Sequence, residues 1–405
     1  MPEARLSVDI NPARGGLSPF ALGFRPFFLG AGAAAVALMA VWLAVLGGNL
    51  PAPGYYAGTV WHAHEMLFGY IAAVIAGFLL TAVRNWTGMA TPTGARLAAL
   101  FGLWAAARIA PFLPVPGVVV AALDLAFFPM LALGLVGPLW RGGNRTNRVF
   151  LGLFAGMTLA CGLVHLDALG LAGGTAAAGD RLMLDLALLT LLIVAGRVVP
   201  FFTERAVAGA KADVSPLVET LTFTLAPALV LAHLLALLPW SGQRPSATLA
   251  AVLAIAVALV QVRRFWGWLD GRGWRIPMLA VLYAGYLWLI VGLALDALAW
   301  LGWLAPFPAL HALTAGAFGV FTLGMMARVT LGHTGRVVES APATTLAFVL
   351  VNAAALARVL PPLVVPASYS TWLVVSGSLW MLSFGVFVWV YGPMLLRPRI
   401  DGRPG

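Results

Sequence analysis

The sequence predicts an all-α, polytopic membrane protein with twelve transmembrane helices, and two observations lead to this class. Hydrophobic residues make up 61% of the 405 residues and charged residues only 9%, a composition that soluble domains do not have. The apolar residues also form continuous runs instead of alternating with polar ones, which excludes a membrane β-barrel. The net charge of +10 lies in short loops, where a basic excess indicates topology, so no nucleic-acid partner is expected.

Twelve apolar runs define the predicted spans. Each is long enough to cross a hydrocarbon core of about 30 Å, which takes about 20 helical residues. The spans lie near residues 20–46, 57–83, 95–113, 117–139, 149–171, 181–202, 217–239, 246–264, 277–303, 309–331, 343–364 and 370–395. We expect the whole chain, residues 1–405, to form a single domain in the lipid bilayer.

The basic residues gather on one side of the predicted membrane. The loops of that side carry Arg84, Arg96, Arg141, Arg145, Arg148, Arg205, Lys211, Arg263, Arg264, Arg272, Arg275, Arg336, Arg397, Arg399 and Arg403. The opposite loops hold little beyond Arg181 and Arg244. Because basic loops stay in the cytoplasm, the sequence predicts that the N-terminus and the C-terminus are both cytoplasmic.

Two stretches of the sequence align without a gap. Residues His311–Gly335 can be laid on His64–Gly88, which superposes the two histidines, Gly69 on Gly316, and the closing Thr-Gly pairs. A third copy lies at Asp180–Arg205, and the helices that follow the three copies also match. Polar residues carry these matches, so a shared apolar composition does not explain them.

The matches group the spans into three repeats of four helices, at about residues 20–141, 147–266 and 276–397. Because four is an even number, the repeats share one orientation. They are therefore expected around a pseudo-threefold axis along the membrane normal.

Five of the six histidines are predicted to lie in one layer of the membrane, near its outer face. They are His62, His64, His165, His233 and His311, and only His333 lies on the cytoplasmic side. An ionisable side chain in a span is costly without a partner, so its default interpretation is functional. The layer therefore predicts a metal or haem site near the outer face.

His64 and His311 are the pair that we expect to bind a haem. They occupy equivalent positions in two repeats, and the face of His64 continues through Phe68, Ile71 and Ile75 as a flat apolar wall that suits a porphyrin. Small residues on both helices would let a planar cofactor approach closely. Ordinary helix packing uses the same small residues and is the alternative.

His62 is expected to act separately from His64. Residues two apart on a helix point about 200° apart, so the two histidines cannot bind one metal ion unless the helix begins late. His62 lies three residues before Glu65, a spacing at which the carboxylate is placed to orient the imidazole. His62 is therefore a candidate ligand for copper or for a second haem.

Two buried arginines each keep two interpretations. Arg108 and Arg358 lie near the outer ends of their helices. Arginine binds carboxylates bidentately, so haem propionates are suitable partners. The alternative is pairing with Asp124, Asp167 or Asp296, or with free carbonyls.

The remaining histidines also keep their alternatives. His165 is either a ligand of a third site or a hydrogen-bonded core histidine. His233 stands where the other repeats have arginine, which favours a propionate or a structural role over metal ligation. His333 either caps its helix or lines a cytoplasmic entrance.

Other site chemistries find no support in the sequence. It contains no Walker A, GxGxxG or HExxH motif and no Ser/His/Asp arrangement. The single cysteine, Cys161, excludes an intrachain disulfide and a Cys-rich metal site. The reactions of soluble enzymes are therefore not expected.

Several motifs resemble those of the NnrS family. They are FRPFF (24–28), WHAHEMLFG (61–69), NWTG (85–88), GRVVPFFT (196–203), HALTAGAFG (311–319) and ARVTLGHTGR (327–336). The resemblance implies a bacterial inner-membrane protein that contains haem, expected to be b-type, and copper, and that is linked to denitrification and nitric oxide stress. It also implies metal-binding roles for His62, His64, His165, His311 and His333.

Two positions depart from the pattern expected for this family. Arg84 stands where we expect proline, and Tyr283 stands where we expect another histidine in the ninth span. If that histidine is a ligand elsewhere in the family, a site is altered or missing in this chain.

The predicted architecture is also similar to subunit I of haem–copper oxidases and nitric oxide reductases. Those proteins hold a low-spin haem between histidines of the second and tenth helices, and His64 and His311 fall on these helices. The copper histidines of the oxidases have no equivalent, because the sixth span has no histidine and the seventh has only His233. The similarity is an analogy between folds.

The sequence therefore predicts a membrane haem protein, with copper as an additional metal, that binds or processes nitric oxide and receives electrons from a donor. Its haem is expected between His64 and His311. Two histidine ligands suggest electron transfer, whereas one histidine and an open face permit nitric oxide binding and an oxidoreductase reaction. The alternatives are a transporter whose histidines line the path of a small molecule or metal, and a non-catalytic nitric oxide sensor.

Overall fold

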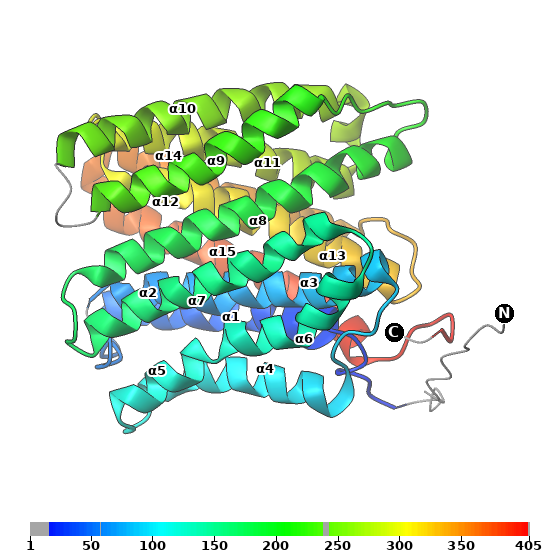
Figure 1. Ribbon diagram of the computed structural model, residues 1–405, viewed down its shortest axis with the longest axis horizontal. Helices are drawn as coiled ribbons and strands as arrows, with labels where there is room; N and C mark the ends of the chain where they lie inside the picture. The colour runs from blue at the N-terminus through cyan, green and yellow to red at the C-terminus, as the bar shows by residue number, and fades with distance from the viewer. Residues whose placement is uncertain (1–15, 57, 238–242, 404–405) are drawn as a thin grey trace.

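The computed structural model describes residues 16–56, 58–237 and 243–403, and within them all regular secondary structure is helical. Twelve of the helical segments are long and apolar enough to cross a membrane. They run in roughly the same direction, along the long axis of the molecule (Figure 1). The predicted class, an all-α protein with twelve membrane spans, is confirmed.

The helices follow one another with short connections. In chain order they are α1 (Phe24–Leu46), α2 (Val60–His64), η1 (Glu65–Ile71), α3 (Ala72–Thr87), α4 (Gly94–Ile109), η2 (Ala110–Phe112), α5 (Gly117–Leu125), α6 (Phe127–Arg141), η3 (Arg145–Arg148), α7 (Val149–Ala168), α8 (Thr175–Ala206), α9 (Pro216–Leu237), α10 (Gln243–Trp268), η4 (Gly271–Arg275), α11 (Pro277–Trp300), α12 (Pro306–His311), η5 (Ala312–Val320), α13 (Phe321–His333), α14 (Pro342–Val364), η6 (Pro366–Ser368) and α15 (Tyr369–Leu396).

Each predicted span overlaps one observed span, and the ends differ by a few residues. The largest extension is in the sixth span, which runs over Thr175–Ala206 where the apolar run predicts 181–202. Hydropathy marks only the apolar part of a helix, whereas the backbone continues beyond it until a terminating residue. The predicted ends at residues 57 and 239 lie outside the described residues.

Three of the twelve spans form the interior of the molecule. In the most apolar stretch of each, 89% of the residues are buried in Val60–Thr87, and 78% in both Thr175–Ala206 and Pro306–His333. The corresponding shares in the other nine spans lie between 28% and 61%. These three spans contain the three aligned sequence stretches. The threefold repeat itself and the cytoplasmic placement of the termini stay predictions.

Two of the inner spans share a backbone irregularity. A π-helical segment, η1, begins directly after His64, and a second, η5, begins directly after His311. A π-helix inserts an extra residue into a helical turn and is frequent at functional sites. Its effect here is to rotate the residues that follow each histidine away from their α-helical positions.

The first span is tied to the last by a buried arginine. The Arg25 guanidinium donates to the carbonyl oxygens of Leu395 at 3.1 Å and of Arg397 at 2.5 Å. The last carbonyls of a helix have no partner inside the helix, and Arg25 supplies one for α15. The first and the last span of the chain are thereby joined.

Candidate metal centre

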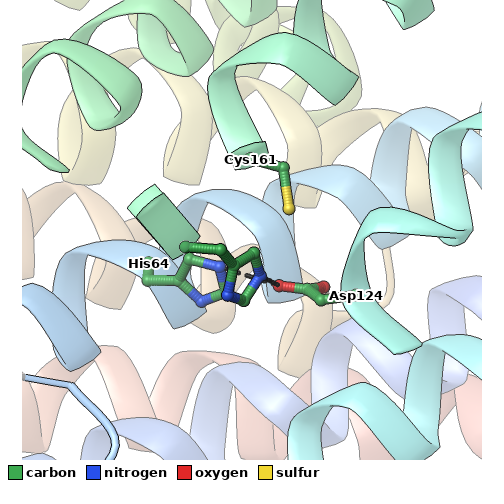
Figure 2. A group of neighbouring side chains, drawn as sticks. His64, Asp124 and Cys161 are labelled. Carbon is green, nitrogen blue, oxygen red and sulfur yellow. Dashed lines mark hydrogen bonds and ion pairs between the residues drawn. The ribbon is translucent and has the colours of Figure 1, made fainter. Parts of the chain in front are cut away.

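Four side chains that can bind a metal ion meet in the interior of the protein. His64 ends α2, Asp124 lies on α5, and Cys161 and His165 lie on α7. Their ligand atoms all lie within 4.8 Å of one another, and all four residues are buried. Figure 2 shows the sulfur of Cys161 directed toward the Asp124 carboxylate and the His64 ring. We name these four residues the His64–His165 centre.

The local sequence explains why these side chains converge. Cys161 and His165 are four residues apart on α7, so they lie on the same face of that helix. Asp124 stands in an otherwise apolar run near the end of α5, where a carboxylate needs partners because no water solvates it. His64 is placed opposite by α2, just before the π-helical turn.

Asp124 joins the members of the centre. Its Oδ2 atom lies 2.8 Å from Nε2 of His64 and 3.2 Å from Nε2 of His165. Its Oδ1 atom accepts a hydrogen bond from Arg108, and the same guanidinium lies 3.1 Å from Oε2 of Glu65. Of the two interpretations of Arg108, pairing with Asp124 is therefore the one that the contacts support.

The charges of this region do not balance when the imidazoles are neutral. Glu65 and Asp124 bring two negative charges, and Arg108 brings one positive charge; all three side chains are at most 8% exposed. A net buried charge is unfavourable in a low-dielectric interior. A proton on an imidazole or a bound metal cation would neutralise it.

Two tyrosines from the loop before α2 cover the centre. The Tyr55 hydroxyl lies 2.9 Å from Nδ1 of His165, and the Tyr56 hydroxyl lies 3.4 Å from Nε2 of His64. Burial, together with the negative charge of Asp124, raises the pKa of Tyr55 to about 12 and holds the pKa of Tyr56 well above its usual value. Both phenols therefore stay protonated. Tyr55 is a donor to Nδ1 of His165, which leaves the ring proton on Nε2, facing Asp124.

The set of ligand atoms suits a transition metal. Two imidazole nitrogens, one thiolate and one carboxylate oxygen are ligands that copper, zinc and iron all accept. Metal–ligand bonds of about 2.0–2.3 Å connect all four atoms after small movements, because the atoms already lie within 4.8 Å of one another. Metal binding through Nε2 of His165 would require the ring proton to lie on Nδ1, where it donates to the Tyr55 hydroxyl, and would release the proton of the Cys161 thiol. The copper implied by the sequence resemblance fits this site.

His62 has neighbours of its own. Its ring stacks on Trp42, with centroids 4.6 Å apart and planes 7° apart, and its Nδ1 atom is buried without a hydrogen-bond partner among the described residues. The separation from His64 agrees with the prediction. The expected contact with Glu65 does not, since Glu65 contacts His64 and Arg108 instead. A buried guanidinium is a stronger partner for a carboxylate than a neutral imidazole, and Arg108 of the third span is that partner.

His311 is prepared to act as a metal ligand. Its Nδ1 atom donates to the carbonyl oxygen of Phe307 at 2.7 Å, which fixes the tautomer and leaves the lone pair of Nε2 available. The positive charge of Arg358 lies close enough to both His62 and His311 to act on their rings. The Arg358 guanidinium donates to the Tyr369 hydroxyl at 2.7 Å, so it keeps donors for an anionic group.

The haem implied by the resemblance fits His311 better than His64. Both ring nitrogens of His64 face carboxylates, and Phe68 stacks on its ring with centroids 4.7 Å apart. This stacking confirms that Phe68 continues the face of His64, but it also places Phe68 on the face predicted for a porphyrin. The pairing of His64 with His311 about one iron stays a prediction.

The two remaining histidines lie in other surroundings. His233 belongs to a second buried ion-pair cluster, 2.9 Å from Asp185 and 3.3 Å from Asp296, with the guanidinium of Arg181 between the two carboxylates. This supports the structural alternative for His233. His333 ends α13, and its ring packs 5.6 Å from that of Phe24.

Sequence reasoning missed part of the centre. It treated Asp124 only as a partner of arginine, set Cys161 aside because it is a single cysteine, and did not consider Tyr55. Two signals could have found them. A carboxylate in an apolar run has no ordinary lipid-facing role, and a cysteine one helical turn before a histidine presents two ligands on one face.

The sequence model of a family described as NnrS protein matches residues 18–399, which is nearly the whole chain. None of the curated proteins compared with the chain matches it.

Proposed function

Because the chain belongs to the NnrS family, we propose that it is a metalloprotein of the bacterial inner membrane that binds or processes nitric oxide. We further propose that the His64–His165 centre holds one metal ion, with copper as the first expectation. One observation carries this proposal: four side chains with ligating N, S and O atoms converge in a buried region that lacks one positive charge when its imidazoles are neutral. NnrS proteins are linked to nitric oxide and denitrification.

The surrounding residues have separate tasks in this proposal. Arg108 holds the carboxylates of Glu65 and Asp124 in place, and Tyr55 orients the ring of His165. Such partners fix the direction of the ligand lone pairs and the affinity of a site. The metal, when bound, would supply a redox couple and a coordination position for nitric oxide. An electron donor is expected as a partner.

A b-type haem is proposed as the second cofactor. His311 is the axial ligand with the better support, because its Nδ1 atom donates to the carbonyl oxygen of Phe307 and its Nε2 atom has no hydrogen-bond partner among the described residues. The second axial ligand is either His64, as the sequence predicts, or His62, whose Nδ1 atom has no partner among the described residues. Arg358, near His62 and His311, is placed to receive a propionate.

Transport of a metal ion is the rival function. It requires a polar path from the histidines of the outer half to His333 at the other end of the tenth span. The inner spans instead enclose an apolar cavity between these levels, which opposes the passage of a charged ion. A non-catalytic sensor would use the same metal centre and differ only in turnover.

The experiment measures bound metal and the optical spectrum of the purified protein. The native protein is expected to hold copper near one ion per chain, and to show a haem band in the reduced-minus-oxidised spectrum. His165→Ala should remove the metal and retain the haem, whereas His311→Ala should remove the haem and retain the metal. Loss of haem in His64→Ala or in His62→Ala then assigns the second axial ligand, and His64→Ala should lose the metal in either case because His64 belongs to the metal centre.

The matched control is His233→Ala. His233 is also buried and also bonded to carboxylates, but it lies outside the centre, so its variant should keep both cofactors. Metal that survives in His165→Ala, or that is lost equally in His233→Ala, would refute the assignment. Consumption of nitric oxide with an added electron donor separates an enzyme from a sensor.

A further inference from the structure

We propose that the apolar cavity among the inner spans is a binding site for a small, uncharged, apolar molecule of the size of a dissolved diatomic gas. The cavity has a volume of about 50 Å³. Its walls come from α3, α8 and the η5–α13 segment, with Phe28 of α1 at one side. The identity of the gas as nitric oxide rests on the proposed function, whereas the cavity itself does not.

The walls of the cavity offer no free polar group. Ten of its twelve lining residues are apolar, and the two exceptions are Thr190 and Thr322. The Thr190 hydroxyl donates to the carbonyl oxygen of Leu186 at 2.9 Å. The Thr322 hydroxyl donates to the carbonyl oxygen of Phe318 at 2.6 Å and is bonded to Tyr70 as well.

A water molecule is therefore a poor occupant. Buried water needs two to four polar partners, and apolar cavities of comparable kind stay dry and accept apolar guests such as xenon. An ion is excluded more strongly, because nothing in the walls compensates for its lost hydration. The chemistry of the walls selects apolar molecules.

The residues that line the cavity are also buried in the protein. Eleven of the twelve lining residues are at most 8% exposed, and only Phe78 is half-buried. They belong to the three most buried spans, so a guest in the cavity is surrounded on several sides by helices of the interior.

The cavity lies on the same helices as the candidate ligands. Ile75, in its wall, follows His64 by eleven residues on one continuous span, and Phe318 follows His311 by seven. A gas held in the cavity would therefore lie further along these two spans than either histidine.

Xenon is the probe for this site. The purified protein, equilibrated with xenon, should show one saturable binding site by xenon-129 NMR, and a structure determined under xenon pressure should show the atom between α3, α8 and α13. Ala187→Leu fills the cavity from α8 and should abolish the saturable signal. The structure of the unmodified protein under xenon decides the question if this variant does not fold.

The matched control is Ala226→Leu. Ala226 is a buried alanine in the wall of a different cavity of about 20 Å³, so the same change of volume there should leave xenon binding between α3, α8 and α13 unchanged. Absence of xenon from the cavity overturns the proposal, and so does a tightly held lipid chain found in it by structure and mass spectrometry. Equal loss of signal in both variants also overturns it.

The proposed metal centre and the proposed gas-binding cavity can be refuted independently of each other. Ala187→Leu should retain its metal and haem and bind nitric oxide more slowly, while His165→Ala should lose metal and still bind xenon. Metal-free native protein that binds xenon would refute the metal centre alone. Metal-loaded protein without xenon binding would refute the cavity alone.

Discussion

The Nε2 atom of His64 lies 2.8 Å from the Oδ2 atom of Asp124, so a histidine of the second span and an aspartate of the fourth are joined in the interior. The same carboxylate reaches His165 of the fifth span and Arg108 of the third. One side chain thus connects four consecutive spans. The stability of this part of the bundle and the binding of a metal ion are therefore expected to depend on the same residue.

Asp124→Asn should destabilise the protein and remove the metal. The change leaves the Arg108 guanidinium buried with fewer negative partners, and breaking a buried ion pair in this way costs about 3–5 kcal/mol. Thermal unfolding of the purified protein and its metal content are the measurements. Asp213→Asn is the control, because the Asp213–Arg263 pair is more than half exposed and such pairs contribute about 0–1 kcal/mol. Equal effects of the two substitutions would contradict this account.

Gly69→Ala should disturb the centre through Arg108. A Cβ atom at this position would lie 3.1 Å from Cδ of Arg108 and 3.3 Å from Oε2 of Glu65, so both side chains would have to move. Overpacking of this kind costs about 1–3 kcal/mol, and metal affinity should fall with it. Gly102→Ala on α4 meets nothing within 4 Å and should be neutral or stabilising by up to about 1 kcal/mol. The two unfolding temperatures and the metal titrations test the difference.

The phenol of Tyr55 should lose its proton only at high pH. Its pKa is raised to about 12, first by burial and then by the charge of Asp124, compared with about 10 in an unfolded chain. A pKa that is higher in the folded state stabilises the fold fully below pH 10, and this contribution disappears as the pH rises through 12. The difference in tyrosinate absorbance between the native protein and Tyr55→Phe should therefore appear only near pH 12. It should move to lower pH in Asp124→Asn, and a step near pH 10 in the native protein would contradict the arrangement.

Tyr283→Phe should leave the metal content unchanged. The Tyr283 hydroxyl lies 2.8 Å from that of Thr203 and accepts a hydrogen bond from the backbone nitrogen of Asp270, so the residue that replaces an expected histidine is part of a structural contact. Its removal should cost about 1 kcal/mol. Tyr391→Phe breaks a similar buried bond to Thr344 and should behave alike. Loss of metal or haem in Tyr283→Phe alone would place a cofactor at this position.

The fold could be predicted from the sequence because a bilayer demands long apolar helices. The twelve spans and their approximate bounds follow from hydropathy alone. The aligned stretches at His64 and His311 also point to the spans that form the interior, since close packing requires their small residues. The π-helical segments were not predictable, because they change local spacing without changing composition.

The candidate site could be predicted only in part. His64 and His165 were found because an imidazole in a membrane span needs a partner. The meeting of Asp124 with Cys161 and His165 depends on how α5 packs against α7, and helical periodicity does not give that contact. The partner of Glu65 was predicted wrongly for a related reason, since its contact with Arg108 depends on how the third span packs against the second.

X-ray absorption at the copper edge of the purified protein tests the central claim most directly. The account predicts a spectrum with nitrogen or oxygen neighbours at about 2.0 Å and one sulfur near 2.3 Å, and it predicts that the sulfur contribution disappears in Cys161→Ser. A protein that binds no metal, or a metal whose spectrum is the same in the native protein and in Cys161→Ser, would contradict it.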